Sequence, residues 1–205
     1  MEFLRRQTKS AGRRVALVPG SYNPPTNAHR ALLEAALTHV DEAVAVLPRA
    51  FPHKSYDGVT LEDRVRMLEL MSPEPYSIAI SEGGLFIEMC EEFLAAAGGP
   101  AEVHIVCGRD AAERFLGWSY PEPGTLDRMF ASFQLLVAAR QGEFVAPELF
   151  RARVHALGIN PEHDSASSTE VRERVRTGGE WRHLVPDAVV GLVEYLYHSG
   201  GLPAP

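Results

Sequence analysis

The chain carries the sequence GSYNPPTNAH from Gly20 to His29, between a short apolar run and a helical pattern. The run before it, residues 14–19, reads RVALVP and predicts a buried strand. After it, apolar residues recur at helical spacing between Thr26 and Val40, which predicts a helix. Gly20 lets the backbone approach a ligand closely, and Asn23 precedes a proline, which keeps the loop extended. A strand followed by a helix is the repeating unit of α/β folds.

The same loop predicts an anion site. Thr26 is a favourable N-cap residue for the helix, and His29 lies in its first turn, three residues later. The amide hydrogens of that turn have no partner inside the helix and face the same space, so a phosphate is a suitable ligand. A tight strand-to-helix loop without a ligand is the alternative interpretation.

A second stretch, SSTEVR from Ser167 to Arg172, has the spacing of a helix start. Ser167 and Glu170 are three residues apart, as in a capping box. This helix N-terminus offers amides and hydroxyls, and the nearby Arg172 can hold a phosphate through two hydrogen bonds. Taken alone, the stretch fits an ordinary capped helix with a solvated arginine. Together with the first motif, it favours a second phosphate-binding element.

Strands and helices alternate along most of the chain. Further strands are predicted at residues 42–47, 76–80, 102–107, 133–138 and 155–160, and further helices at 61–71, 85–97, 111–118, 147–156, from 167–168 onward and at 186–200. This alternation predicts an α/β fold with a Rossmann-like, doubly wound parallel sheet, covered on both faces. Ligands bind such sheets beyond the carboxyl ends of the strands. Residues 1–12 are predicted to be a flexible N-terminal tail, and residues 13–205 a single domain.

Composition excludes several classes of protein. The chain has 205 residues, of which 45% are apolar and 23% charged, as in ordinary globular proteins. The formal net charge of −7 disfavours generic nucleic-acid binding, and no apolar run is long enough to predict a membrane span. Two distant cysteines predict neither a disulfide framework nor a zinc site, so we expect a reducing, cytoplasmic setting. The motifs of P-loop kinases, dinucleotide oxidoreductases and α/β-hydrolases are absent from the sequence.

The two motifs together resemble those of the (H/T)xGH nucleotidyltransferase superfamily. Residues 26–29 match its (H/T)xxH element, with Ala28 where glycine is usual, and residues 167–172 match its SSTxxR signature. The resemblance covers nearly the whole chain after the tail and implies the nucleotidyltransferase type of Rossmann-like sheet. It is greatest to the adenylyltransferases of nicotinate or nicotinamide mononucleotide. These enzymes transfer AMP from ATP to a pyridine mononucleotide and release pyrophosphate, in NAD biosynthesis.

Other elements strengthen this resemblance, and one departs from it. Residues 52–54 resemble a segment with a substrate-side lysine, and residues 108–110 followed by Trp118 resemble a G-x-D…W element. Residues 184–186 and the valines after them match the C-terminal helix of that branch. The departure lies at residues 84–89, where a polar Tyr-Thr pair that contacts the pyridine nucleotide is missing. The adenylyl transfer is therefore better supported than the identity of the acceptor.

The resemblance implies a role for each site residue. His29, Lys54 and Arg172 are expected to be catalytic, with Lys54 also binding the acceptor and Trp118 stacking on the acceptor base. The nucleotide is expected to contact residues of the two motifs and of the G-x-D element, which are Gly20, Ser21, Tyr22, Asn23, Thr26, Gly108, Asp110, Ser167, Ser168 and Thr169. Mg²⁺ is expected to bind through the ATP phosphates, so we predict no metal site built by the protein.

Three alternatives remain open from the sequence. The same chemistry could act on another phosphorylated acceptor, such as phosphopantetheine, or use CTP in place of ATP. A non-catalytic nucleotide sensor is the third, although the positive residues expected at both the attacking and the leaving positions disfavour it. The expected partners are ATP and a small phosphorylated acceptor, with no nucleic acid and no membrane, and the family resemblance suggests a homo-oligomer.

Overall fold

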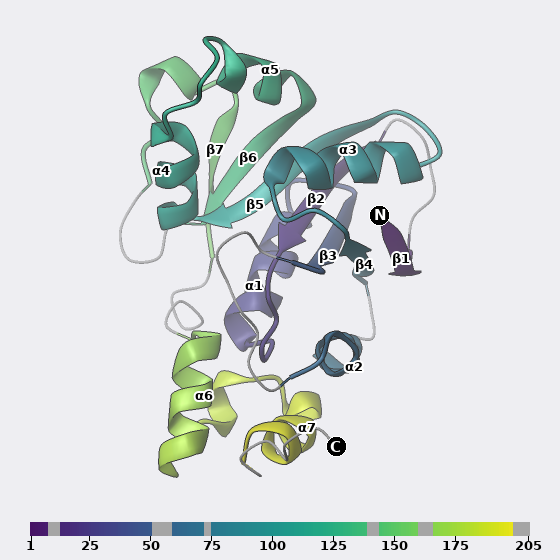
Figure 1. Ribbon diagram of the computed structural model, residues 1–205, viewed down its shortest axis with the longest axis vertical. Helices are drawn as coiled ribbons and strands as arrows, with labels where there is room; N and C mark the ends of the chain where they lie inside the picture. The colour runs from purple at the N-terminus through teal and green to yellow at the C-terminus, as the bar shows by residue number, and fades with distance from the viewer. Residues whose placement is uncertain (8–12, 51–58, 72–74, 139–143, 160–165, 199–205) are drawn as a thin grey trace.

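The computed structural model describes residues 1–7, 13–50, 59–71, 75–138, 144–159 and 166–198 (Figure 1). Its centre is a seven-stranded sheet with the order β1-β4-β3-β2-β5-β6-β7. The strands are β1 Glu2–Arg5, β2 Arg13–Pro19, β3 Glu42–Pro48, β4 Ser77–Ser81, β5 Ala101–Gly108, β6 Phe133–Ala138 and β7 Val154–Leu157. All pairs from β4 to β7 are parallel, and β1 adds an antiparallel edge.

The chain winds outward from β2 in two directions. It passes first through β3 to β4, and then crosses back to lay β5, β6 and β7 on the other side of β2. This is the strand order of a doubly wound Rossmann-type sheet, so the predicted fold class is confirmed. The inner strands are apolar along their length because both faces of the sheet are covered.

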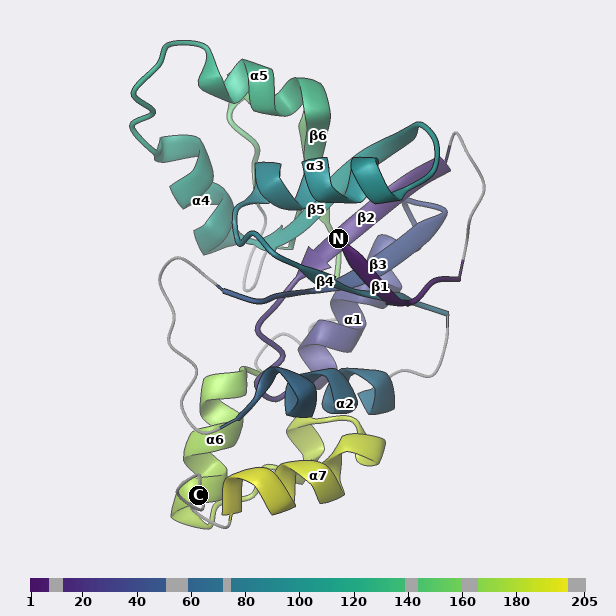
Figure 2. The same cartoon turned by 45° about the vertical axis from the view of Figure 1, so that its right-hand side comes forward.

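The helices form two layers, one on each face of the sheet (Figures 1 and 2). One face is covered by α1 Asn27–Ala36, α2 Leu61–Met71, α6 Ser168–Thr177 and α7 Asp187–His198. The other face is covered by α3 Phe86–Ala96, α4 Arg109–Gly117 and α5 Thr125–Ser132. Along β2, Ala16 and Val18 pack toward the first layer, and Val15 and Leu17 toward the second.

The sheet divides at its carboxyl edge between β2 and β5. Their pairing ends at Leu17 and Ile105, whereas β2 stays paired with β3 as far as Pro19 and β5 with β6 as far as Gly108. The two strands therefore separate over their last residues, at the point where the winding direction reverses. Ligands bind α/β sheets at such a switch point.

The prediction of a flexible tail is wrong for the first residues of the chain. Glu2–Arg5 form β1, where Phe3 contacts Phe93 of α3 with ring centroids 6.1 Å apart. The basic residues of this segment have partners, since Arg5 donates to the Tyr76 carbonyl and Arg6 to the carbonyls that end α3. Residues 8–12 lie outside the described residues, and the single domain at 13–205 stays a prediction.

Two other segments differ from prediction. Residues 147–156 do not form the expected helix, because only Glu148–Phe150 make a 3-10 turn before β7 begins at Val154. Leu149, the central residue of this turn, is 83% exposed, so the segment presents no buried apolar face. The sequence analysis also missed the short helix α5. It begins directly after Gly124, a glycine whose backbone is in the left-handed region.

Candidate active site

Tyr22 anchors the loop after β2 to the core of the molecule. Its ring is fully buried, and its hydroxyl donates to the Val18 carbonyl at 2.7 Å. Tyr22 adopts a φ of 46°, and a Cβ on Gly20 would lie 2.9 Å from its ring. Gly20 is thus required because the tyrosine folds back beneath it. Direct contact of either residue with a nucleotide stays a prediction.

His29 is oriented by the residue that begins its helix. The Thr26 N–H donates to Nδ1 of His29 at 3.1 Å, and the Thr26 hydroxyl lies 2.8 Å from the same nitrogen. A backbone N–H can only donate, so Nδ1 is the accepting nitrogen and a neutral ring carries its proton on Nε2. The Tyr22 ring supports the imidazole, with centroids 4.9 Å apart. This arrangement presents an N–H donor at the first turn of α1.

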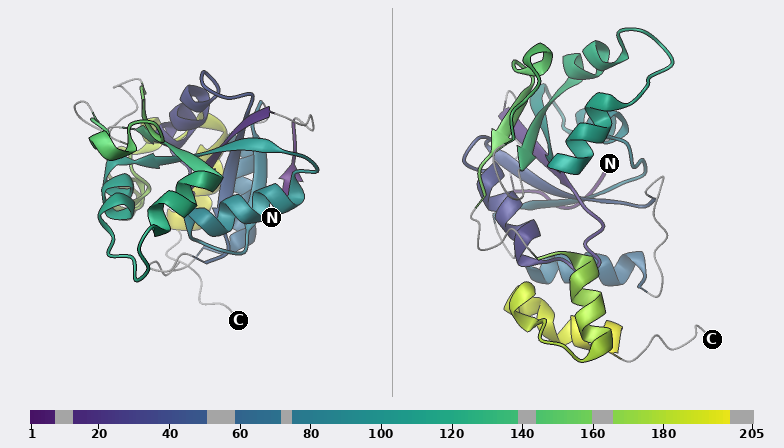
Figure 3. Two further views of the ribbon diagram at one scale, coloured as in Figure 1. Left: turned by 90° about the horizontal axis from the view of Figure 1, so that it is seen from above. Right: turned by 90° about the vertical axis from the view of Figure 1, so that its left-hand side faces the viewer.

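The structure brings the two sequence motifs into direct contact. The Thr26 hydroxyl donates to the Ala166 carbonyl at 3.2 Å, and the Ser168 hydroxyl donates to the Pro24 carbonyl at 2.8 Å. Ser167 caps α6 by accepting from the Glu170 N–H at 3.1 Å, as its spacing predicted. The N-termini of α1 and α6, far apart in sequence, therefore lie side by side (Figure 3). Both offer amide hydrogens to one region.

Two arginines donate hydrogen bonds to backbone carbonyls of the loop after β2. Nη1 of Arg172 donates to the Asn23 carbonyl, and its Nη2 donates to the Thr169 hydroxyl at 3.3 Å. Arg64 of α2, which is 2% exposed, donates to the Ser21 carbonyl at 3.3 Å. In a trans peptide the N–H points opposite to the C=O, so the amide that follows Ser21 points away from Arg64. The loop thus turns carbonyls toward the helices and an N–H away from them.

The sequence analysis missed the role of Arg64. The available signal was its place in the helix. It shares the buried face of α2 with Met67, Leu68 and Met71, where an arginine requires polar partners.

The G-x-D element leads into α4, and Trp118 directly follows the last residue of that helix. Gly108 ends β5 and caps α4, directly across the divided edge of the sheet from the loop after β2. Asp110 and Trp118 both line an open hollow of about 680 Å³, together with Glu113, Arg114 and Gly117. Trp118 is 62% exposed, so its ring is accessible to a ligand. Lys54, the third residue with an expected catalytic role, lies outside the described residues.

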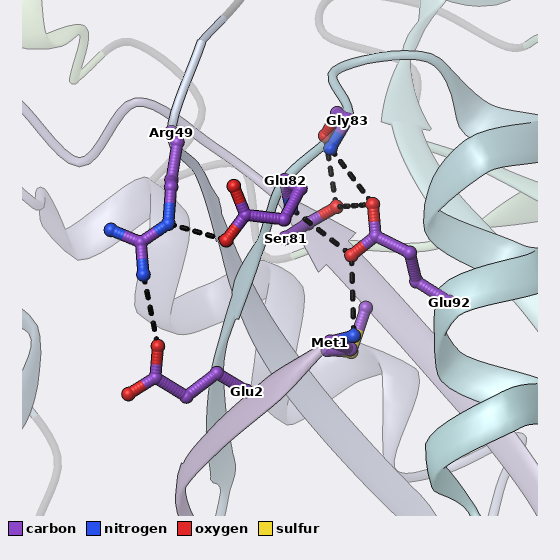
Figure 4. Close-up of polar contacts among 7 residues, drawn as sticks. All are labelled: Met1, Glu2, Arg49, Ser81, Glu82, Gly83 and Glu92. Carbon is purple, nitrogen blue, oxygen red and sulfur yellow. Dashed lines mark hydrogen bonds and ion pairs between the residues drawn. The ribbon is translucent and has the colours of Figure 1, made fainter.

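The segment that departs from the family pattern forms the turn between β4 and α3. Leu85 precedes α3 and is 49% exposed, and its N–H donates to the Glu88 carboxylate at 2.9 Å. A second carboxylate, that of Glu92, accepts from the Gly83 and Glu82 amides at 2.8 and 3.0 Å (Figure 4). The helix itself therefore supplies the groups that hold the turn, and the position before the helix carries an apolar side chain.

Arg49 closes the outer side of this turn. It directly follows β3, and its guanidinium contacts Glu82 at 2.6 Å and Glu2 of β1 at 2.9 Å (Figure 4). These ion pairs join the ends of β3 and β4 to the edge strand. They lie in solvent, so they orient the turn more than they stabilise the fold.

The donors at the two helix N-termini suit phosphate oxygens rather than a metal ion. They are amides, hydroxyls, a guanidinium and an imidazole N–H, and the described residues contain no group of three or more His, Cys, Asp or Glu that could hold a metal. Within the same residues, no helix is long and apolar enough to span a membrane.

A family model described as cytidylyltransferase-like matches residues 17–174, which includes both motifs. The chain belongs to this family. It is therefore a nucleotidyltransferase, and the family match spans β2 to α6. The resemblance inferred from the sequence is confirmed.

Curated relatives extend over nearly the full length. A protein of Anaeromyxobacter dehalogenans named "Probable nicotinate-nucleotide adenylyltransferase" is 30% identical over 196 residues, covering 90% of this chain and 96% of the relative. One of Gemmatimonas aurantiaca with the same name is 26% identical, covering 86% and 87%. The solved structure of Plasmodium falciparum nicotinic acid mononucleotide adenylyltransferase complexed with APC has a TM-score of 0.67 at 13% identity, covering 91% of this chain and 98% of that one. At that identity the structural likeness supports the fold alone.

Proposed function

We propose that this nucleotidyltransferase transfers AMP from ATP to nicotinate mononucleotide and releases pyrophosphate, a step of NAD biosynthesis. The observation that carries the proposal is the contact between the N-termini of α1 and α6. It gathers the donors that a triphosphate needs beside the switch point of the sheet. The names of the full-length relatives point to the same acceptor.

The reaction requires positioning more than acid–base chemistry. The acceptor phosphate is an anion at neutral pH, so it attacks the α-phosphorus of ATP without a general base. The site must align two highly charged groups and stabilise the charge that develops on the departing pyrophosphate. Fixed hydrogen-bond donors and positive charge are the groups that this task needs.

The two motifs divide the work between them. The Nε2–H of His29 and the first amides of α1 bind the phosphates near the reacting centre. The α6 N-terminus, with the hydroxyls of Ser168 and Thr169, binds the leaving pyrophosphate. Arg172 keeps further N–H donors beyond those that contact Asn23 and Thr169, and directs them to the same phosphates. Lys54 bridges the acceptor phosphate and the α-phosphate.

The other side of the divided edge binds the nucleosides. Asp110 accepts from ribose hydroxyls, and the exposed ring of Trp118 stacks on the acceptor base. Mg²⁺ held by the triphosphate neutralises charge on the leaving group. The buried free thiols of Cys90 and Cys107 agree with a reducing, cytoplasmic setting. A homo-oligomer is part of the same proposal.

Pyrophosphate release from Mg²⁺-ATP tests the proposal across four conditions: nicotinate mononucleotide, nicotinamide mononucleotide, 4′-phosphopantetheine and no acceptor. We expect release with nicotinate mononucleotide. That result would mean that the enzyme tolerates the absence of the Tyr-Thr pair at residues 84–89. Release with nicotinamide mononucleotide alone would change the acceptor within the same pathway.

One observation favours a different acceptor, such as 4′-phosphopantetheine. The β4–α3 turn carries the exposed Leu85 where the family has a polar pair. Release only with 4′-phosphopantetheine would keep the chemistry and move the pathway. ATP binding without release in any condition would contradict the adenylyltransferase, and CTP as donor or a sensor would then be tested.

A further inference from the structure

Tyr197 lies near the end of α7, outside every motif of the sequence. Its hydroxyl donates to Oδ1 of Asn23, a residue 174 positions earlier in the loop after β2. Asn23 is only 6% exposed, so this contact is made inside the molecule. The last helix of the described chain therefore contacts a side chain in the middle of the loop after β2.

Both oxygens of Asn23 accept hydrogen bonds from helices of the same layer. Its backbone carbonyl accepts from Arg172 of α6, and its side-chain oxygen accepts from Tyr197 of α7. The amide nitrogen occupies the other branch of the carboxamide and makes no hydrogen bond with the described residues. The side chain of Asn23 thus has two N–H donors that could bind an anion at this loop.

The direction of this carboxamide has a consequence for phosphate binding. The last torsion of an asparagine is broad and roughly two-fold, so a half-turn exchanges its oxygen with its nitrogen. In one orientation the group presents donors to a phosphate, and in the other it presents an oxygen that a phosphate repels. Some outside contact has to select the first orientation.

Tyr197 is suited to make that selection because of its neighbours. Burial raises the pKa of the phenol, and the nearby Arg172 and Arg64 guanidiniums oppose the rise without cancelling it, so the hydroxyl keeps its proton. Guanidinium groups are positively charged and cannot accept a hydrogen bond, so the hydroxyl proton of Tyr197 is not directed to them. The proton goes to Asn23, which must present an acceptor.

We propose that Tyr197 is a positioning residue that holds the Asn23 carboxamide with its NH₂ group toward the ATP phosphates. This inference rests on the proposed function, because it assumes that the loop binds ATP. It assigns a task in nucleotide binding to the last helix, which contributes none of the site residues expected from the sequence.

The test is Tyr197→Phe, with Tyr195→Phe as the matched control on the same helix, since Tyr195 is 71% exposed. We measure the Kd of Mg²⁺-ATP without acceptor, the melting temperature, and kcat and KM for each substrate. We expect Tyr197→Phe to weaken ATP binding and raise the ATP KM roughly three- to tenfold, the worth of one hydrogen bond. The acceptor KM and the melting temperature should match those of Tyr195→Phe.

Asn23→Ala supplies the second arm. It should weaken ATP binding by itself, and Tyr197→Phe should then add nothing further, because its only target is gone. Equal losses from Tyr197→Phe in both backgrounds would overturn the inference. So would a Tyr197→Phe variant that melts earlier but binds ATP like the control, since that is a purely structural role. Wild-type protein that binds ATP but releases no pyrophosphate would contradict the proposed function and leave the Kd comparison to decide the inference.

Discussion

At the scale of single residues, His29 owes its orientation to backbone rather than to a partner acid. The Thr26 N–H sets which ring nitrogen carries the proton, and the buried Tyr22 ring sets the plane of the imidazole. A histidine fixed in this way donates a hydrogen bond without needing a positive charge. It therefore suits transition-state stabilisation better than proton transfer.

Replacement of His29 by alanine tests this role. We expect kcat to fall by on the order of 10²–10³, as when one donor to a transition state is removed, with the fold retained. Pyrophosphate release measures the rate, and circular dichroism checks the fold. His39→Ala, at an exposed position just after α1, is the control and should retain full activity. An unchanged kcat in His29→Ala would remove the residue from the catalytic machinery.

At the scale of elements, the β4–α3 turn shows a helix stabilising its own entry. Glu88 and Glu92 lie one turn apart on α3 and accept hydrogen bonds from the residues that lead into it. Burial raises the pKa of the Glu92 carboxyl, but hydrogen bonds from Gly83, Glu82 and Ser81 lower it by more, so the net pKa lies below its ordinary value. The ionised form is therefore favoured by folding.

This predicts an acid-dependent contribution to stability. A group whose pKa is lowered by folding stabilises the protein above its unfolded pKa, and the stabilisation is lost as the pH falls through the folded pKa. We expect the free energy of unfolding of Glu92→Gln to decline less steeply than that of wild type below about pH 4.5. Urea unfolding across that range measures it, with Glu91→Gln, at the exposed neighbour, as the control. Parallel curves for wild type and Glu92→Gln would show that the carboxylate contributes nothing.

At the scale of the whole molecule, a buried ion cluster holds the N-terminal segment to the amino edge of the sheet. Arg13 of β2 contacts the Glu42 carboxylate of β3 at 2.7 Å, with side chains 4% and 1% exposed. The Ser77 hydroxyl of β4 donates to the same carboxylate at 2.5 Å and accepts from the Gln7 N–H at 3.0 Å. The cluster thus joins three strands and the segment after β1, at the edge opposite the active site.

Adjacent acidic residues allow a direct comparison of buried and exposed ion pairs. Removing one partner of a buried pair leaves an uncompensated charge, so Glu42→Ala should destabilise the fold by roughly 3–5 kcal/mol. Asp41→Ala removes the exposed pair with Arg14 and the hydrogen bond from the Arg14 N–H, and should destabilise the fold much less than Glu42→Ala. Denaturant unfolding measures both variants. Similar losses would mean that burial does not govern these pairs.

The sequence predicted the elements better than their ends and edges. Strong apolar runs such as β2 and β5 were recognised because both faces of these strands are buried. β1 was missed because four residues with alternate positions exposed resemble a solvated tail, and their stability comes from pairing with β4. The short helix α5 was missed for a similar reason, since eight residues carry little periodicity.

The sequence by itself determined the family, the fold class and the two motifs at the helix starts, because these depend on local chemistry: a glycine and prolines in a loop, capping residues, and apolar periodicity. Only the tertiary structure decided that these stretches meet, that Arg64 and Arg172 hold the carbonyls of one loop, and that Tyr197 reaches Asn23. Those contacts join residues from about 40 to more than 170 positions apart. Such pairings depend on the packing of helices on a sheet, which no local pattern encodes.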